Sequence, residues 1–307
     1  MKRKYYKAFD SDMKCNNKQY KENTIYEEEG NRICSKGVMH FCPTPLDTLD
    51  YYLVSDAHGR LARWAEIKPL SRILSKGNKR ASNAIEVLSE ISFKDFIKES
   101  IKVIKEKVSQ HKSGFVYKDS DNLEVNSNHV QIASDVENAN IVCCKDNCKI
   151  AAINSKRINI YGNRNIACLD SDNCTDVFIE DGGGNQINSL GDHTFVFDNG
   201  DANKIHLIGN CSVVFSNGIS SKLILDGEKS KACLTHAYSK IILNGKKSIG
   251  CSLGYMGFVR GKIGDWIILT EWDKEGNPNI VSFKIDGHKY KEDTFYYLNN
   301  GNIEIAH

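Results

Sequence analysis

Glycine recurs every nine residues through the second half of this 307-residue sequence. The register runs without a gap from residue 173 to residue 262, and glycine starts eight of its ten units. The glycine positions are Gly182, Gly191, Gly200, Gly209, Gly218, Gly227, Gly245 and Gly254, and Asn173 and His236 start the other two units. So short and regular a period is typical of a solenoid, in which each unit stacks on its neighbours. We expect each glycine to supply a positive φ for a turn.

Apolar residues alternate with polar ones after each glycine, as in a short strand. In one set of units the apolar residues take the fifth and seventh places, as Phe195 and Phe197 do. In the alternate set they take the sixth and eighth, as Ile205 and Leu207 do. Two alternating registers predict two strands in each coil of about 18 residues, hence two parallel sheets facing each other across a narrow core. We expect Lys231, which interrupts the apolar column, to distort its coil.

The predicted fold is an α+β head, a parallel β-solenoid of nine-residue units and a small antiparallel β cap. We place the head at residues 1–112, a connector at 113–124, the solenoid at 125–262 and the cap at 263–307. Within the head, residues 92–111 carry apolar side chains at helical spacing and predict one long helix. The cap would cover the open sheet edge of the last coil.

Composition gives little information about a partner. The formal net charge is only +2, so no global field attracts nucleic acid or a membrane. Eleven cysteines are spread from Cys15 to Cys251, and residues 1–10 lack the apolar stretch of a signal peptide. We therefore expect a cytoplasmic protein without membrane contact or cofactor, in which most cysteines are small buried residues.

One cationic column stands out in the repeat. Lys204, Lys222 and Lys240 occupy the same place in every second unit, so they should stack along one outer face, with Lys149 and Lys156 as candidate extensions. A ladder of like charges is either fully solvated or meets an anion, such as a nucleic-acid backbone or an acidic protein. The column is the candidate partner-binding site.

The opposite sheet is expected to have an apolar outer face. The proposed register turns Val196 and Val214 outward, where they would pack on the helix at residues 92–110 or on a second copy of the chain. A homo-oligomer formed through this face is therefore one of the expected assemblies.

The head contains four residues of the types that bind zinc. Cys15, Cys34, His40 and Cys42 fall within one small domain, which a metal ion would stabilise. The spacing of these residues matches no common zinc finger, so buried free cysteines remain the alternative, and we expect no metal.

An enzymatic alternative comes from the segment that includes residues 33–67. A strand, a short helix with tyrosines and a second strand also occur in this order in ADP-ribosyltransferase folds. The residues that would act are His40, Tyr51, Tyr52 and Glu66, with an aromatic ring stacked on nicotinamide and a carboxylate polarising the ribose.

Both ends of the chain resemble an uncharacterised family of phage and prophage proteins. The head segments "AFDSDMKC" and "ICSKGVMHFCPTPLDTLDYY" carry the likeness, as does the ending "GKIGDWIILTEWDKEGNPNIVSFKID" followed by "KEDTFYYLNNGNIEI". In that family a similar head precedes many short glycine-containing repeats, but those repeats are rich in alanine, serine and glycine, whereas these units carry bulky residues.

The resemblance implies a phage origin and, by association, an inhibitor of a host defence complex of the anti-CRISPR kind. A solenoid presents long rigid surfaces with little concavity, which suits binding better than catalysis. We therefore expect a non-enzymatic binding protein whose partner is a host protein or nucleoprotein. The alternatives are the ADP-ribosyltransferase-like head and a structural virion protein.

Overall fold

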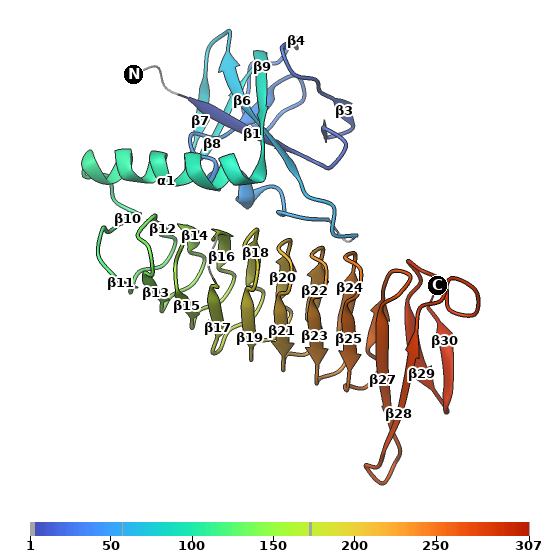
Figure 1. Ribbon diagram of the computed structural model, residues 1–307. Helices are drawn as coiled ribbons and strands as arrows, with labels where there is room; N and C mark the ends of the chain where they lie inside the picture. The colour runs from blue at the N-terminus through green and yellow to red at the C-terminus, as the bar shows by residue number, and fades with distance from the viewer. Residues whose placement is uncertain (1–3, 57, 172–173, 307) are drawn as a thin grey trace. The chain divides into compact units, whose positions relative to one another are not determined.

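The computed structural model describes residues 4–56, 58–171 and 174–306 (Figure 1). Asn173, the expected start of one repeat unit, lies outside the described residues. The chain forms two compact units, residues 1–107 and 108–307. The α+β head, the parallel β-solenoid and the antiparallel cap are all confirmed.

The head is built from three small antiparallel sheets. One contains β1 (Tyr5–Phe9), β6 (Arg63–Pro69), β9 (Ala84–Ile91) and β4 (Thr24–Glu27), in that order. The second contains β5 (Met39–Phe41), β8 (Lys79–Ser82) and β7 (Leu74–Lys76). The third pairs β2 (Lys14–Cys15) with β3 (Lys18–Gln19). A bridge between Tyr6 and Cys42 joins β1 to the end of β5.

The predicted long helix of the head forms, and a short 3-10 helix precedes it along the chain. The helix α1 (Phe93–Ser109) starts after Ser92, whose hydroxyl oxygen accepts the backbone N–H of Asp95 at 3.1 Å. The short 3-10 helix η1 (Leu46–Asp50) follows Pro45, and Thr44 Oγ1 accepts the N–H of Asp47 at 3.1 Å. Its Thr48 is held in turn by Trp64 Nε1 at 3.1 Å.

Short strands alternate between the two long sheets of the solenoid (Figure 1). The even-numbered sheet contains β10 (Phe115–Tyr117), β12 (Gln131–Ser134), β14 (Lys149–Ile153), β16 (Ile166–Asp170), β18 (Gln186–Ser189), β20 (Lys204–Leu207), β22 (Lys222–Leu225), β24 (Lys240–Leu243) and β26 (Phe258–Arg260). The odd-numbered sheet contains β11 (Asn122–Val125), β13 (Asn140–Cys143), β15 (Arg157–Ile160), β17 (Asp176–Ile179), β19 (Phe195–Asp198), β21 (Val213–Ser216), β23 (Lys231–Leu234), β25 (Ile249–Ser252) and β27 (Trp266–Trp272). The strands β10 and β11 pair in parallel with β12 and β13, so the solenoid starts inside the segment expected as a connector.

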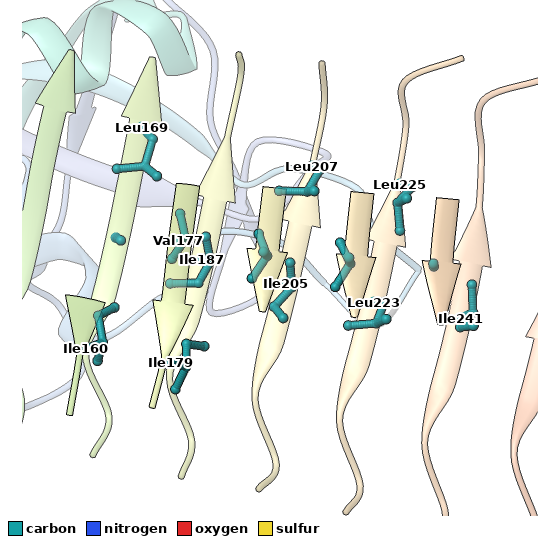
Figure 2. Close-up of a cluster of buried hydrophobic side chains, with 14 of the residues drawn as sticks. Ile160, Leu169, Val177, Ile179, Ile187, Ile205, Leu207, Leu223, Leu225 and Ile241 are labelled. Carbon is teal, nitrogen blue, oxygen red and sulfur yellow. The ribbon is translucent and has the colours of Figure 1, made fainter. Parts of the chain in front are cut away.

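The interior is a continuous apolar column. Ile205 pairs with Leu223, and Leu223 with Ile241, each one coil further on. Figure 2 shows these side chains following one another inside the solenoid, and all three are fully buried. The predicted coil, with two strands and two repeat units, is therefore confirmed. Upstream the coils vary in length. Asn140 pairs with Arg157, which is 17 residues later, whereas Ile166 pairs with Gln186, which is 20 residues later.

The proposed inward positions are wrong for β19, β21 and β25 of the odd-numbered sheet. Val196 and Val214 are buried register partners in the core, whereas Phe195, Phe197 and Phe215 lie on the outer face and are partly exposed. Val196 and Val214 therefore cannot form an outer face for a second copy. The error has a physical cause: the eighth place in these units is a buried polar residue, such as Asp198, which hydrophobicity alone does not assign to a core.

Lys231 does not distort its coil. It lies exposed on the outer face of β23 and pairs in register with Val213 and Ile249, while Ala232 and Leu234 fill the core. The lysine was expected to interrupt an inner column, but its position in this sheet is an outer one.

Most of the repeat glycines are required by close packing and not by positive φ. A Cβ built on Gly227 would lie 1.9 Å from the carbonyl oxygen of Gly209 one coil below, and one on Gly245 would lie 2.1 Å from that of Gly227. Positive φ occurs two places later, at non-glycine residues such as Ser220 (58°) and Lys229 (57°). The backbone N–H of Lys229 then donates to the carbonyl of Lys246 in the next coil at 3.0 Å.

Buried polar side chains fill the fourth place of most units and form a column on each side of the solenoid. The backbone N–H of Asn185 donates to Asn203 Oδ1 at 2.7 Å, and that of Ser221 donates to Ser239 Oγ at 3.0 Å, in each case one coil further on. At the cap, Asp265 continues the pattern by accepting the N–H of Ser248 at 2.8 Å. These side chains accept hydrogen bonds from backbone N–H groups that are buried at the corners of the coils and would otherwise have no acceptor.

The cap changes the strand direction. β27 is parallel to β25 but antiparallel to β28 (Pro278–Lys284), while β26 pairs with β29 (Tyr296–Asn299), which pairs with β30 (Asn302–Ile305). All eleven cysteines are free, but only Cys42, Cys143, Cys148 and Cys168 are buried, so the expectation that most are buried is wrong. None of the helices among the described residues has both the length and the apolar character needed to cross a membrane.

Candidate functional site

The head contains a cavity of about 690 Å³, open to solvent, between β1, β5 and the segments around β2 and η1. Six of the residues that the sequence proposed for this domain line it: Cys15, Cys34, His40, Cys42, Tyr51 and Tyr52. They come together because β1 is bridged to the end of β5 through Tyr6 and Cys42. The cavity falls within the usual size range of small-molecule sites.

Lys7 is a lining residue that the sequence analysis missed. It lies in the middle of β1, and its side chain is nearly inaccessible, because the residue is only 3% exposed. Its Nζ donates to the carbonyl of His40 at 2.9 Å and to Cys15 Sγ at 3.2 Å. The ammonium also lies 5.2 Å from the centroid of the Tyr20 ring. A lysine inside the apolar run "YYKAF" was the only signal in the sequence.

Tyr51 and Lys79 form a second part of the lining. The Lys79 ammonium lies 4.4 Å from the centroid of the Tyr51 ring, a cation–π distance. The Tyr51 hydroxyl donates to Asn78 Oδ1 at 2.5 Å, which fixes the ring. Desolvation raises the pKa of Tyr51 to about 12, so its hydroxyl is a neutral donor at physiological pH. Burial and a hydrogen bond to Cys15 raise the pKa of Tyr52 as well.

The charge on the cavity wall is mainly positive. Among its described lining residues are four lysines, Lys7, Lys18, Lys36 and Lys79, and one carboxylate, Glu28. Glu28 forms an ion pair with Lys18, which neutralises the negative charge of Glu28. The wall therefore offers cationic groups and aromatic rings, and little negative charge to repel an anion.

The four candidate zinc ligands line the cavity but do not form a cluster. Across residues 4–56, 58–171 and 174–306, no three histidine, cysteine or acidic side chains lie close enough together to hold a metal ion. Two contacts disfavour a metal ion among the four candidate zinc ligands. The Lys7 ammonium lies against Cys15 Sγ, where it would repel a cation, and His40 Nε2 already accepts the backbone N–H of Cys34 at 3.1 Å. Desolvation, with help from Lys79 and Lys7, lowers the pKa of His40, so its imidazole is neutral.

Glu66 is separate from the other residues of the enzymatic alternative. His40, Tyr51 and Tyr52 line the cavity, but Glu66 is not among its lining residues. Its carboxylate accepts a hydrogen bond from Lys4 Nζ at 2.8 Å. The structure thus brings together three of the four residues proposed for ADP-ribosyl transfer and leaves out the carboxylate on which the chemistry would depend.

The second candidate site is the lysine column of the solenoid. Lys204, Lys222 and Lys240 are direct register partners at the start of β20, β22 and β24. Adjacent parallel strands are about 4.8 Å apart, which sets the spacing of the column. Lys204 and Lys240 are exposed and Lys222 is half-buried. Lys240 also lies 5.4 Å from the ring centroid of Phe258, the next residue in the column.

The candidate extensions of this column differ. Lys149 occupies the same register, but Ile166 and Gln186 separate it from Lys204, and it is buried. Lys156 precedes β15 of the other sheet and is not part of the column. The continuous cationic surface therefore consists of Lys204, Lys222 and Lys240, which we call the lysine column.

Comparison with known proteins identifies part of the head only. Residues 3–99 match a family described as a domain of unknown function, DUF7666. No curated protein matches the chain. No solved structure matches it either.

Proposed function

We propose that this chain is a non-enzymatic binding protein whose lysine column contacts the phosphate backbone of a nucleoprotein. The observation that carries the proposal is the register of β20, β22 and β24, which stacks three lysines on consecutive coils. Three positive charges stacked on consecutive coils form a line to which an anionic backbone can bind.

Flexible lysine side chains can match the spacing of the column to that of this partner. Strands of the solenoid repeat every 4.8 Å or so, and one strand of a nucleic-acid duplex carries a phosphate about every 3.4 Å of its axis. Lysine is a compact charge on a flexible four-carbon stem, so neighbouring lysines can adjust to this difference. The backbone of the sheet holds the three lysines in one row, and their flexible side chains allow each ammonium group to move toward a phosphate. Resemblance to phage proteins favours a host defence complex as the nucleoprotein.

Binding of labelled DNA and RNA oligonucleotides, measured by fluorescence anisotropy, tests the proposal. The triple variant Lys204→Gln, Lys222→Gln, Lys240→Gln should bind at least tenfold more weakly than the unmodified chain. A matched control replaces Lys274, Lys284 and Lys291, three exposed lysines of the cap, with glutamine and so changes the net charge by the same amount. Equal losses in both triple variants, or no binding by the unmodified chain, would refute the lysine column as the contact.

A further inference from the structure

The ammonium group of Lys7 has an unusual environment for a buried charge. Its residue is 3% exposed, and its described contacts are a carbonyl oxygen, a thiol and two aromatic rings. None of the described ion pairs joins Lys7 to a carboxylate. Removing a charge from water costs several kcal/mol unless an opposite charge compensates it. The cavity beside Lys7 is the space in which an anion could do so.

Further cationic groups converge on the same space. Lys79 and Lys36 line the cavity, and no described ion pair involves either of them. Both Lys7 and Lys79 lie near enough to His40 to lower its pKa, so the two ammonium groups act on one region of the wall. Because Lys18 neutralises Glu28, no unpaired carboxylate among the described lining residues opposes an anion.

The rest of the wall sets the class of anion. A phosphate ion alone would leave most of a cavity of about 690 Å³ empty. Tyr20, Tyr51 and Tyr52 add aromatic surface to the lining, and the ring of Tyr51 is held by its bond to Asn78. Fixed aromatic rings next to cationic groups suit a ligand that carries a planar ring together with its negative charge.

We infer that the head cavity is a binding site for an organic phosphate of mononucleotide size, with its phosphate groups near Lys7 and Lys79 and its planar ring against the tyrosines. This site is distinct from the lysine column, because all its lining residues lie between positions 6 and 79. The inference therefore does not depend on the proposed nucleoprotein partner.

Isothermal titration calorimetry of the full chain with ADP, inorganic pyrophosphate and adenosine tests the inference. We expect ADP to bind, pyrophosphate to bind more weakly and adenosine to bind weakest, because only ADP has both the charge and the ring. ADP should also raise the thermal midpoint, since a ligand that binds only the folded state stabilises it. An absence of heat and of a midpoint shift with millimolar ADP and pyrophosphate would overturn the inference.

Variants separate the contributions of the wall. Lys79→Met should weaken ADP binding at least tenfold, and Tyr51→Ala should weaken ADP binding while leaving pyrophosphate unchanged. The control Lys21→Met changes an exposed lysine of the head that does not line the cavity, and should bind as the unmodified chain does. Lys7→Met tests the buried charge, with circular dichroism to show that the variant folds. If it does not fold, Lys79→Met tests the contribution of the cationic wall. Binding unaffected by Lys79→Met would contradict the assignment.

The lysine-column variant distinguishes the two sites. If both proposals hold, the triple glutamine variant at Lys204, Lys222 and Lys240 loses oligonucleotide binding and retains ADP binding. Loss of ADP binding in this variant, with the head still folded, would contradict a site confined to the head.

Discussion

The rings of Phe197 and Phe215 stack with their centroids 5.5 Å apart and their planes within 4°. They are register partners on the outer face of the odd-numbered sheet, while Val196 and Val214, each one residue earlier, are partners in the core. The sheet is thus apolar on both faces at this level, but only the inner face is sealed from water. Neighbouring residues of one strand should therefore differ in their effect on stability.

Val196→Ala should lower the free energy of unfolding by about 2 kcal/mol, because it opens a gap in a close-packed core. Phe197→Ala should cost less, although it removes a larger side chain, since the partly exposed ring loses only its outer contacts. Urea unfolding followed by circular dichroism measures both values. A larger loss for Phe197→Ala would mean that the strand faces the other way.

Gly227 and Lys229 should respond in opposite directions to substitution. Gly227→Ala brings a Cβ within 1.9 Å of a backbone oxygen, so the coils must separate, and we expect a loss of several kcal/mol or failure to fold. Lys229→Gly removes the strain of a side chain at φ 57° and should raise stability by a few tenths to about 1 kcal/mol. Thermal melting of the two variants checks the pair. Stabilisation by Gly227→Ala would refute the close-approach role of the glycine column.

Ser239→Ala tests the polar column at the fourth place. Ser239 Oγ accepts the N–H of Ser221 and donates to the carbonyl of Gly218 at 3.1 Å, so its loss leaves a buried donor unpaired. We expect a cost of about 1 to 3 kcal/mol. Ser282→Ala, at an exposed position of β28, is the matched control and should change stability by less than about 0.5 kcal/mol. Equal small effects in urea unfolding would show that the column contributes nothing.

Asp198 should make the solenoid less stable as the pH rises. Burial raises the pKa of this carboxyl group above its ordinary value of 3.8, against the opposing effect of hydrogen bonds from Ser216, Asn203 and Gly200. A raised pKa in the folded state means that folding favours the protonated form. The stabilisation is therefore complete below the ordinary value and is lost as the pH rises through the raised one.

The variant Asp198→Asn removes this titration. Relative to the variant, the unmodified chain should lose stability in urea unfolding as the pH rises from the ordinary value of 3.8 through the raised pKa of Asp198. The effect of Asp265, whose pKa is also raised by burial, cancels in the comparison. A difference that is constant with pH, or one that grows in favour of the unmodified chain, would contradict the role of burial.

Repeat spacing predicted the coil, because a strand and a turn of constant length return the chain to the same place whichever face is buried. It could not assign the faces of the odd-numbered sheet, where Phe197 is more hydrophobic than the buried Asp198 beside it. Asp198 is tolerated inside because Ser216 and Asn203 satisfy it. The role of Gly227 was equally hidden, since its constraint comes from Gly209 in another coil.

The two candidate sites also differ in how far the sequence alone could predict them. The lysine column followed from the period alone, because register and sequence spacing coincide there. In the head, residue types and local spacing singled out His40, Tyr51 and Tyr52. The approach of Lys7 to Cys15 and the contact of Lys79 with Tyr51 depend on how separate strands pack, and no local pattern reports that.

The salt dependence of oligonucleotide binding tests the central claim most directly. Each phosphate neutralised on a duplex contributes about −0.9 to the slope of log K against log salt concentration. Replacing Lys204, Lys222 and Lys240 with glutamine should reduce the size of that slope by about 2.7, whereas the cap control at Lys274, Lys284 and Lys291 should leave it unchanged. An unchanged slope in the lysine-column variant would show that these three lysines do not contact the phosphate backbone.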